Sequence, residues 1–449
     1  MLDAKPIAQL GDPLPTPPVL SGGAPLLGHM LEFYRDQEQF FRRGYREHGD
    51  VFAVKFAGQP VAILVGPENH DFFFSHTDKE LDMEAPYGFL AAMFGKIAFL
   101  GNHETYLLHR PVLHSLFGRQ QMVDYLEVMS RAVAEWVDGL GESGEIDITF
   151  AMQELVKEVA GRCFLGDAAH ARLEAAGFWE EYDILSKSLD PLLYKLPLPK
   201  FIRRDQAKRR IGEILRPLID ERRAQPQDDG FQRLLEQPDA SGKPLPEDIV
   251  ANFFSAILFA GHETTAGQAA WSLIQLAEHP EVLENVRAEV DEVLAGDRVV
   301  DHIKLRDLRL VDAAVKETGR MHPSAETLIR GVKQDVQLGG YRIPKGWFVM
   351  TSTAAAHFIP GLFQDPFAYD PTRFLERKEG KANEYISFGG GMHKCTGMNF
   401  ANAEMAIITA LLFQRYEIEL ITPIDKVGVS RSGSSRPTKA LIRYRRRPS

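Results

Sequence analysis

The segment from Pro246 to His279 is the feature of this sequence that most constrains its fold. Apolar residues cover most of its helical circumference, and a helix of that kind is expected to be buried. Pro246 suits the first turn of a helix, and Pro280 suits its end. At a rise of 1.5 Å per residue, about 33 residues span on the order of 50 Å, enough to cross a whole domain. The sequence therefore predicts a large, mainly helical fold organised around one buried central helix.

The rest of the chain is predicted to supply further helices and a few short strands. Residues 1–20 are rich in proline, which favours an extended lead-in. Residues 32–48 have a helical pattern, and residues 51–56 and 61–65 alternate in the way of a β-hairpin. No Gly-Pro-Ser-rich linker divides residues 21–449, so we expect them to form a single domain with small β-sheets.

Composition argues against several classes of function. The net charge of −10 disfavours nucleic acid as a partner, because phosphate binding needs a basic face. Only two cysteines occur, Cys163 and Cys395, which excludes a disulfide framework and an all-protein zinc site. No apolar run approaches the roughly 20 residues of a transmembrane helix, and the N-terminus has no signal-peptide core. We therefore expect a cytoplasmic protein without a transmembrane anchor.

Cys395 lies in a glycine-rich decapeptide that runs from Phe388 to Gly397. An alanine-rich apolar segment follows, so the thiolate would sit at the start of a helix, where backbone N–H groups favour negative charge. The glycines would let the backbone lie flat against a large planar group. Cys395 is therefore a candidate haem ligand, and a thiolate ligand favours O–O cleavage at iron. The alternative is a glycine-rich turn with an incidental cysteine.

Polar residues also occur where packing alone does not explain them. In the middle of the central segment, small residues stand beside the carboxyl of Glu263 and the hydroxyl of Thr264. A threonine in mid-helix normally donates back to a carbonyl one turn earlier. Glu317 and Arg320 lie three residues apart, which is the spacing of an ordinary surface ion pair.

The decapeptide resembles the haem-binding signature of the cytochrome P450 monooxygenases. Phe388, Gly391, Cys395 and Gly397 stand at the matching positions. The resemblance implies the cytochrome P450 fold, haem b with the Cys395 thiolate as its axial ligand, and O2 as co-substrate. Gly391 and Gly397 would then allow close approach to the porphyrin, and Phe388 would cover the sulfur.

Other segments follow in the order of the same family. The segment around Glu263 and Thr264 is similar to its oxygen-activation motif, which implies that both residues relay protons to oxygen. Plain packing is the alternative. Glu317-x-x-Arg320 matches the family's Glu-x-x-Arg pair, and Arg373 matches the third member of that triad. The resemblance implies a buried network that supports folding and haem retention and takes no part in the chemistry.

Four residues are candidates for binding the haem propionates. The family places basic residues at the positions of Arg110, Arg330 and His393, and charge-assisted hydrogen bonds to carboxylates suit those side chains. Arg110 belongs to Tyr106-x-x-x-Arg110, which resembles the family's Trp-x-x-x-Arg helix with tyrosine in place of tryptophan. Tyr87 would add a phenolic donor.

A closer likeness is to the sterol 14α-demethylase branch, especially its soluble bacterial form. Residues 87–95 resemble that branch's loop over the haem, with Ala92 where proline is usual. The branch has histidine where this chain has Glu263, and an apolar strand where it has Glu326. A carboxylate against a sterol's hydrocarbon face is costly unless it is paired or neutral. The candidate pocket residues are Phe89, Met93, Phe94, Phe259, Ala260, Ala325 and Glu326.

These observations predict a haem-thiolate monooxygenase that hydroxylates an apolar small molecule such as a terpenoid, polyketide, fatty acid or sterol. We expect Glu326 or Glu263 to meet a polar group of a non-sterol substrate. The chain has no flavin or iron–sulfur motif, so electrons would come from a ferredoxin or flavodoxin-type donor with its NAD(P)H reductase. The alternatives are a sterol 14α-demethylase proper and a haem-binding sensor or carrier without turnover.

Overall fold

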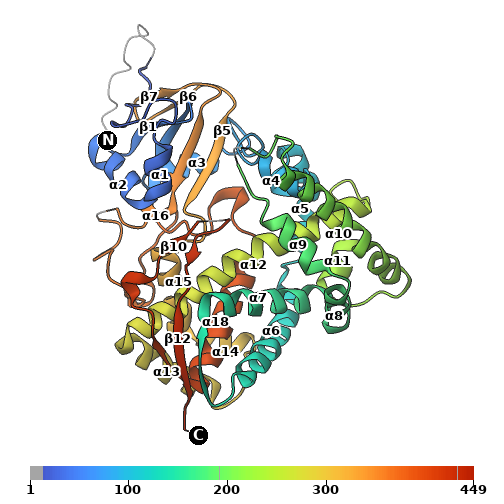
Figure 1. The fold of residues 1–449 in the computed structure, drawn as a ribbon. Coiled ribbons are helices and arrows are strands. Elements are labelled where there is room, and N and C mark those ends of the chain that lie inside the picture. The colour runs from blue at the N-terminus through green and yellow to red at the C-terminus, as the bar shows by residue number, and fades with distance from the viewer. Residues whose placement is uncertain (1–13, 192, 360, 432, 449) are drawn as a thin grey trace, which may run out of the picture.

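The predicted central helix is α12, which spans Glu247–Glu278 and crosses the middle of the computed structural model (Figure 1). The structure describes residues 14–191, 193–359, 361–431 and 433–448. Pro246 is the N-cap of α12, and Glu247 and Asp248 place negative charge in its first turn, where the helix dipole favours it. The prediction of a mainly helical fold around one long helix is confirmed.

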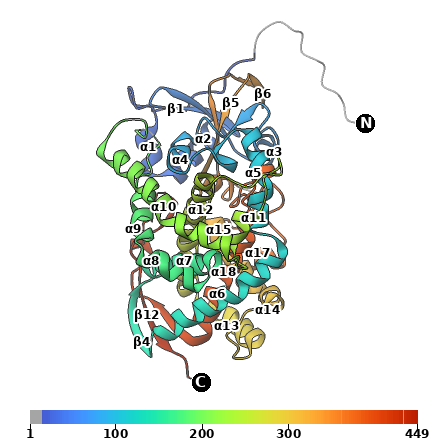
Figure 2. The ribbon, with the colours of Figure 1, turned by 90° about the vertical axis from the view of Figure 1, so that its right-hand side faces the viewer.

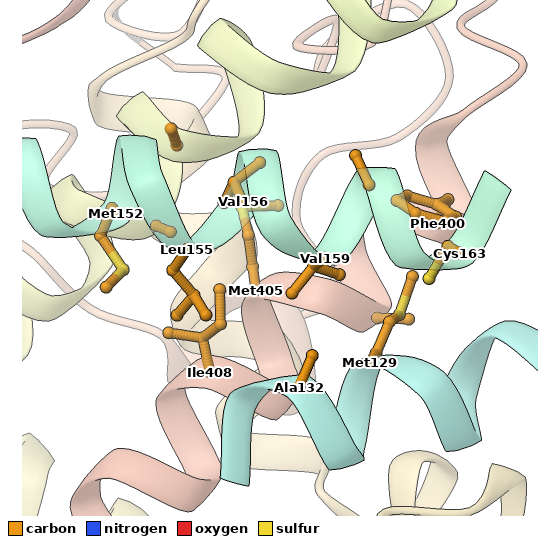
Figure 3. Packing of buried hydrophobic residues seen from close by; sticks show 14 of the residues in the cluster. Met129, Ala132, Met152, Leu155, Val156, Val159, Cys163, Phe400, Met405 and Ile408 are labelled. Carbon is orange, nitrogen blue, oxygen red and sulfur yellow. The ribbon is translucent and has the colours of Figure 1, made fainter. Parts of the chain in front are cut away.

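Helix α12 is buried because other helices cover it. It packs against α7 (Ile148–Leu165), α15 (Arg309–Met321) and α18 (Met398–Arg415). The same hydrophobic core includes α6 (Arg119–Gly139). Figure 3 shows this packing from close by, with Leu155 of α7 pointing toward Ile408 of α18.

A five-stranded sheet with the order β1-β2-β8-β5-β3 holds a second core. Strand β2 pairs with β8 in parallel, and the other neighbours pair antiparallel. The predicted hairpin is confirmed: Ala57 and Gly58 have φ values of 48° and 87°, the left-handed geometry of a tight hairpin turn. The strands are β1 (Val51–Phe56), β2 (Gln59–Leu64), β3 (Leu81–Asp82), β5 (Thr327–Val332) and β8 (Phe348–Ser352).

Three smaller sheets complete the β structure of the described residues. They are β4-β12-β9, β6-β7 and β10-β11. Their strands are β4 (Ser143–Asp147), β6 (Val336–Leu338), β7 (Tyr341–Ile343), β9 (Tyr416–Leu420), β10 (Val429–Ser430), β11 (Arg436–Pro437) and β12 (Leu441–Arg446). In Figure 2 the five-stranded sheet lies toward the top of the view, and β4 and β12 lie toward the bottom of the view.

The other helices cover the sheet and the outer faces of the core. They are α3 (Pro67–Ser75), α4 (Gly88–Phe94), α5 (His103–Ser115), α8 (Asp167–Ala175), α9 (Phe178–Ser186), α10 (Pro199–Ala224), α11 (Gly230–Glu236), α13 (Pro280–Leu294), α14 (His302–Asp307), α16 (Thr353–Ala356) and α17 (Thr372–Leu375), with 3-10 turns at Ala98–Leu100, Gly391–His393 and Ile424–Lys426.

The single helix predicted for residues 32–48 is wrong. The structure has α1 (Met30–Arg35) and α2 (Gln37–His48), separated by Asp36 with φ −156° and ψ 93°. The Asp36 side chain accepts from the backbone N–H of Gln39 and so starts a new helix.

The predicted lead-in over residues 1–20 lies partly outside the described residues. Of its described part, Pro18 and Leu20 hydrogen-bond to Ala53 of β1, so this part is extended beside the sheet. Over the ranges that the structure describes, no helix has both the length and the apolar character needed to cross a membrane.

Candidate active site

A cavity lies between the middle of α12 and the loop that carries Cys395. The residues from α12 are Ile257, Ala260, Gly261, Thr264, Thr265 and Gln268. Those from the loop and the start of α18 are Phe388, Gly389, Gly390, His393, Lys394, Cys395, Thr396, Gly397, Phe400, Ala401, Asn402, Glu404 and Met405. Further walls come from α3, α5, α7, α15 and β5 and from the segments beside Met83, Tyr87 and Ser387. The two sequence segments predicted to form one site therefore do face one space.

The Cys395 loop is held by its own backbone. The N–H of Cys395 donates to the carbonyl of Phe388 at 2.9 Å, which closes the loop just before α18 begins. Burial raises the pKa of the Cys395 thiol, while hydrogen bonds from the backbone N–H groups of Gly397 and Met398 favour its thiolate.

Gly391 and Gly397 have different structural roles in this loop. Gly391 has φ 63°, and a Cβ there would lie 2.9 Å from the Phe74 carbonyl oxygen of α3. The absence of a side chain at Gly391 therefore lets the loop pack on α3, and Gly391 is not among the described residues lining the cavity. Gly397 does line it, and a Cβ there would meet the Phe117 ring at an ordinary 3.8 Å.

Thr264 faces the cavity from α12, and its hydroxyl donates to the Ala260 carbonyl at 2.5 Å. Glu263 points elsewhere. Its carboxylate contacts the Arg436 guanidinium of β11 at 2.6 Å, and it is not one of the described residues that line the cavity. Burial raises the pKa of Glu263, although the Arg436 charge acts in the opposite direction.

Polar groups gather at the rim near β5. Arg330 is 4% exposed, lines the cavity, and donates to the Thr77 hydroxyl at 3.1 Å. The Tyr87 hydroxyl lies 3.4 Å from the backbone nitrogen of Ile329. Arg110 is exposed, contacts His114, and does not belong to the described lining.

His393 has one nitrogen engaged and one without a described partner. Its Nε2 lies 2.6 Å from the Asp78 carboxylate. Its Nδ1 is buried and has no hydrogen-bond partner among the described residues. A carboxylate in the cavity would satisfy that nitrogen and the Arg330 guanidinium, and an iron cation would hold the Cys395 thiolate. These residues fit a haem with its propionates at the rim.

Glu317 joins two arginines behind the Cys395 loop. It contacts Arg320 at 2.7 Å and Arg373 at 3.0 Å, and all three side chains are 0% exposed. The backbone N–H of Asp370 also donates to the Glu317 carboxylate. Both guanidinium groups make further bonds to backbone carbonyls, so the charges are paired and hydrogen-bonded as burial requires.

The lining of the cavity overlaps only in part with the predicted substrate pocket. Ala260 and Ala325 line the cavity. The rest are absent from its described lining: Phe89, Met93, Phe94, Phe259 and Glu326. Met93 and Phe94 are buried in the core, and the Phe94 ring packs against Phe259. Packing in the core therefore accounts for the apolar side chains of Met93 and Phe94 without a contact to a ligand.

Glu326 is paired away from the cavity. Its carboxylate contacts Arg431 at 2.6 Å and accepts from the Ser435 hydroxyl at 2.7 Å. The prediction that Glu326 or Glu263 meets a substrate's polar group is not supported by this arrangement, because each carboxylate already has an arginine partner. The physical reason is that these arginines arrive from a distant segment that local sequence does not connect to either glutamate.

Several lining residues were missed. Aromatic side chains at Phe99, Tyr106 and Phe117 enclose the cavity, and Gln268 and Glu404 are polar members of its wall. The Tyr106 ring lies 4.2 Å from the His393 ring, tilted by 46°, and its hydroxyl donates to the Met392 carbonyl at 2.8 Å. Its place in the Tyr-x-x-x-Arg segment was the signal that could have identified it.

The fold and the cavity define a haem-thiolate class of protein, with a cysteine loop facing a long central helix. The family model described as Cytochrome P450 matches residues 17–439. The chain belongs to the cytochrome P450 family and is a cytochrome P450 monooxygenase. Family membership implies haem with a cysteine thiolate, O2, an apolar substrate and a redox partner.

Similar proteins include sterol demethylases. A sterol 14α-demethylase of Mycolicibacterium vanbaalenii is 32% identical, over 96% of this chain and 98% of its own. A lanosterol 14-alpha demethylase of Bos taurus is 30% identical, over 98% of this chain and 91% of its own. Among solved structures, retinoic acid bound cyanobacterial CYP120A1 superposes with a TM-score of 0.86 and 24% identity, over 97% of this chain and all of that one. The similarity to this solved structure is evidence for the fold alone.

Proposed function

We propose that this monooxygenase hydroxylates a rigid, apolar small molecule of the sterol or terpenoid class. The observation that carries the proposal is the pairing of Glu326 with Arg431 and of Glu263 with Arg436. Because both carboxylates are taken up outside the described lining, neither opposes a hydrocarbon ligand. The apolar Ala325 and Leu328 remain to contact it. Similarity to sterol 14α-demethylases supports the same class.

The cofactor in this proposal is haem b, and residues 21–449 act as one domain around it. Cys395 would hold the iron through its thiolate, Phe388 would shield that sulfur, and Gly397 would give room beside it. Arg330, His393 and Tyr87 would bind the propionates. Arg110, which is exposed, would first have to turn inward. When bound, the haem supplies the iron at which O2 is activated, so that one oxygen atom enters the substrate and the other leaves as water.

Thr264 handles protons in this proposal. Reduction of O2 to one hydroxyl on the substrate and one water consumes two electrons and two protons. The Thr264 hydroxyl faces the cavity and can accept a proton from water and donate its own. Its bond to Ala260 holds the side chain in place. Glu263 stays a predicted proton donor, since its carboxyl would have to leave Arg436 before reaching the cavity.

Electrons come from a ferredoxin or flavodoxin-type donor with its NAD(P)H reductase, in the cytoplasm. Acyclic fatty acids and polyketides are the competing substrate class. A spectral titration of the purified holoprotein with lanosterol, a cyclic terpene and palmitate separates them. We expect a saturable type I shift with the ring compounds and a weaker one with palmitate. Tight binding of palmitate alone would contradict the sterol or terpenoid class.

Thr264→Ala tests the proton role, with Thr264→Ser as its matched control. With a surrogate ferredoxin and reductase, we expect Thr264→Ala to lower product per electron pair by roughly ten- to a hundredfold and to release hydrogen peroxide. The serine variant retains a hydroxyl and should stay close to the parent protein. Full coupling in Thr264→Ala would remove Thr264 from proton delivery. A holoprotein that takes up electrons without product would favour a haem sensor.

A further inference from the structure

A short C-terminal segment lies against the outside of the cavity wall. It consists of residues 429–431 and 433–437, carries β10 and β11, and is called the strap below. Strand β11 packs against α12 and pairs with β10. The strap residues are not among the described residues that line the cavity. The strap therefore contacts the side of the walls that faces away from the cavity.

One side of the strap is fastened to α12. Arg436 contacts the Glu263 carboxylate at 2.6 Å, with both side chains 20% exposed, and the Ser434 hydroxyl donates to the Glu263 carbonyl at 3.1 Å. A Cβ on Gly267 would lie 2.9 Å from the Cβ of Arg436, so this glycine is what allows the close packing. These contacts flank Thr264 in sequence.

The other side of the strap is fastened to the segment before β5. Arg431 contacts the Glu326 carboxylate at 2.6 Å, and the Ser435 hydroxyl donates to the same carboxylate at 2.7 Å. The backbone N–H of Ser435 also donates to the carbonyl of Ser324 at 2.8 Å. Ser324 and Ala325 are lining residues of the cavity. These contacts therefore connect the strap to the segment of Ser324 and Ala325, which forms a second wall of the cavity.

The two walls also meet each other, because the Ser324 hydroxyl donates to the carbonyl of Thr264 at 2.9 Å. This bond joins the wall that carries Thr264 to the wall that carries Ser324 and Ala325. We propose that the strap is a two-point clamp that fixes the separation of these walls, with Arg431 and Arg436 as positioning residues that set which ligands fit. The inference rests on the proposed function in that the cavity holds haem and an apolar ligand.

Two azoles of different size test the clamp in the purified holoprotein. Imidazole reports only access to the haem iron through its type II spectral shift. 1-Tritylimidazole coordinates in the same way but must also fit its bulk between the walls. We expect Arg431→Met and Arg436→Met to change the Kd of 1-tritylimidazole by about five- to tenfold, since neighbouring groups couple by that order, and that of imidazole by less than about twofold.

Matched variants separate positioning from general loss of structure. Arg43→Met removes two ion pairs of similar length, 2.6 Å to Glu32 and 2.7 Å to Glu47, in the region of α1 and α2, and should leave both Kd values unchanged. The swapped pair Glu326→Arg with Arg431→Glu should restore at least part of the bulky-azole affinity. If either arginine variant yields no holoprotein, the lysine variant at the same position, Arg431→Lys or Arg436→Lys, replaces it.

Equal changes in both azoles, or a swapped pair no better than the single variants, would overturn the clamp. Failure of imidazole to shift the spectrum of the parent protein is a different result. It would mean that no accessible haem iron is present, and it would count against the proposed haem site. Unchanged binding of both azoles in every strap variant would also overturn the clamp.

Discussion

Two sets of carboxylate–arginine pairs stand near this cavity, and they differ in burial. Glu317, Arg320 and Arg373 are 0% exposed, and every charge is surrounded by protein. The pairs of the strap, Glu263–Arg436 and Glu326–Arg431, keep between 11% and 27% of their side-chain surface exposed. A fully buried charge that loses its partner has no water to replace it, whereas a partly exposed one does. The first set therefore fixes the fold, and the second can adjust the cavity.

The largest expected effect is on the buried set. Glu317→Gln would leave Arg320 without a counter-charge and Arg373 with Glu379 alone, and loss of a partner in a buried pair costs about 3–5 kcal/mol. We expect a fall of that size in the free energy of unfolding, measured by denaturant titration, together with loss of bound haem. Glu32→Gln, at the partly exposed Arg43 pair, is the control and should change stability little.

A loss below about 1 kcal/mol in Glu317→Gln would break the comparison. The buried network would then resemble the strap pairs in energy, and burial would not be the property that separates them. Haem content in the same variant sharpens the result, because the network lies behind the loop that carries Cys395. Retained stability with lost haem would assign the network to the cofactor and not to the fold.

Acid should act on the same buried region through His357. Its Nδ1 lies 2.9 Å from the Arg320 carbonyl, and its Nε2 accepts from the N–H of Ile386, so the ring is held neutral. Burial lowers the pKa of His357 to about 3, and the nearby Arg320 charge adds to this effect. His322, whose ring stacks on Trp271, has its pKa lowered to about 3, again mainly by burial.

The sign follows from which state binds the proton. Below the ordinary histidine pKa of 6.5, the unfolded chain takes up a proton that the folded protein refuses. Stability is therefore fully present above pH 6.5 and falls as the pH drops toward 3. Between pH 7 and 5 each of the two histidines should cost about 2 kcal/mol.

His357→Gln tests this assignment by the pH dependence of unfolding. The variant removes one buried titration, so the loss of stability between pH 7 and 5 should shrink by about 2 kcal/mol, whatever its stability at pH 7. His302→Gln, at an exposed position of α14, should keep the full pH dependence. An unchanged slope in His357→Gln would show that other groups govern the acid response.

Local pattern explains which parts of the site were predictable. The apolar circumference of α12, the hairpin around Gly58 and the glycine run before Cys395 are all encoded within one short stretch each. The break at Asp36 was missed because a capping aspartate can interrupt an otherwise continuous helical pattern. Glu263 and Glu326 were visible, but their partners lie 173 and 105 residues away, and local spacing carries no information about such contacts.

The smallest expected effect belongs to the strap. Arg431→Met and Arg436→Met should each lower the free energy of unfolding by about 0.2–1 kcal/mol, the range of pairs that remain open to water. A double-mutant cycle of Arg431→Met with Glu326→Gln isolates the pair itself. The comparison between the strap and the buried network then depends on two measurements in the same variant, the change in 1-tritylimidazole affinity and the loss of unfolding free energy. A strap variant that alters bulky-azole affinity severalfold at this small cost would separate cavity shape from stability. A loss of about 3–5 kcal/mol in the free energy of unfolding would instead show that the strap, like the buried network, mainly stabilises the fold.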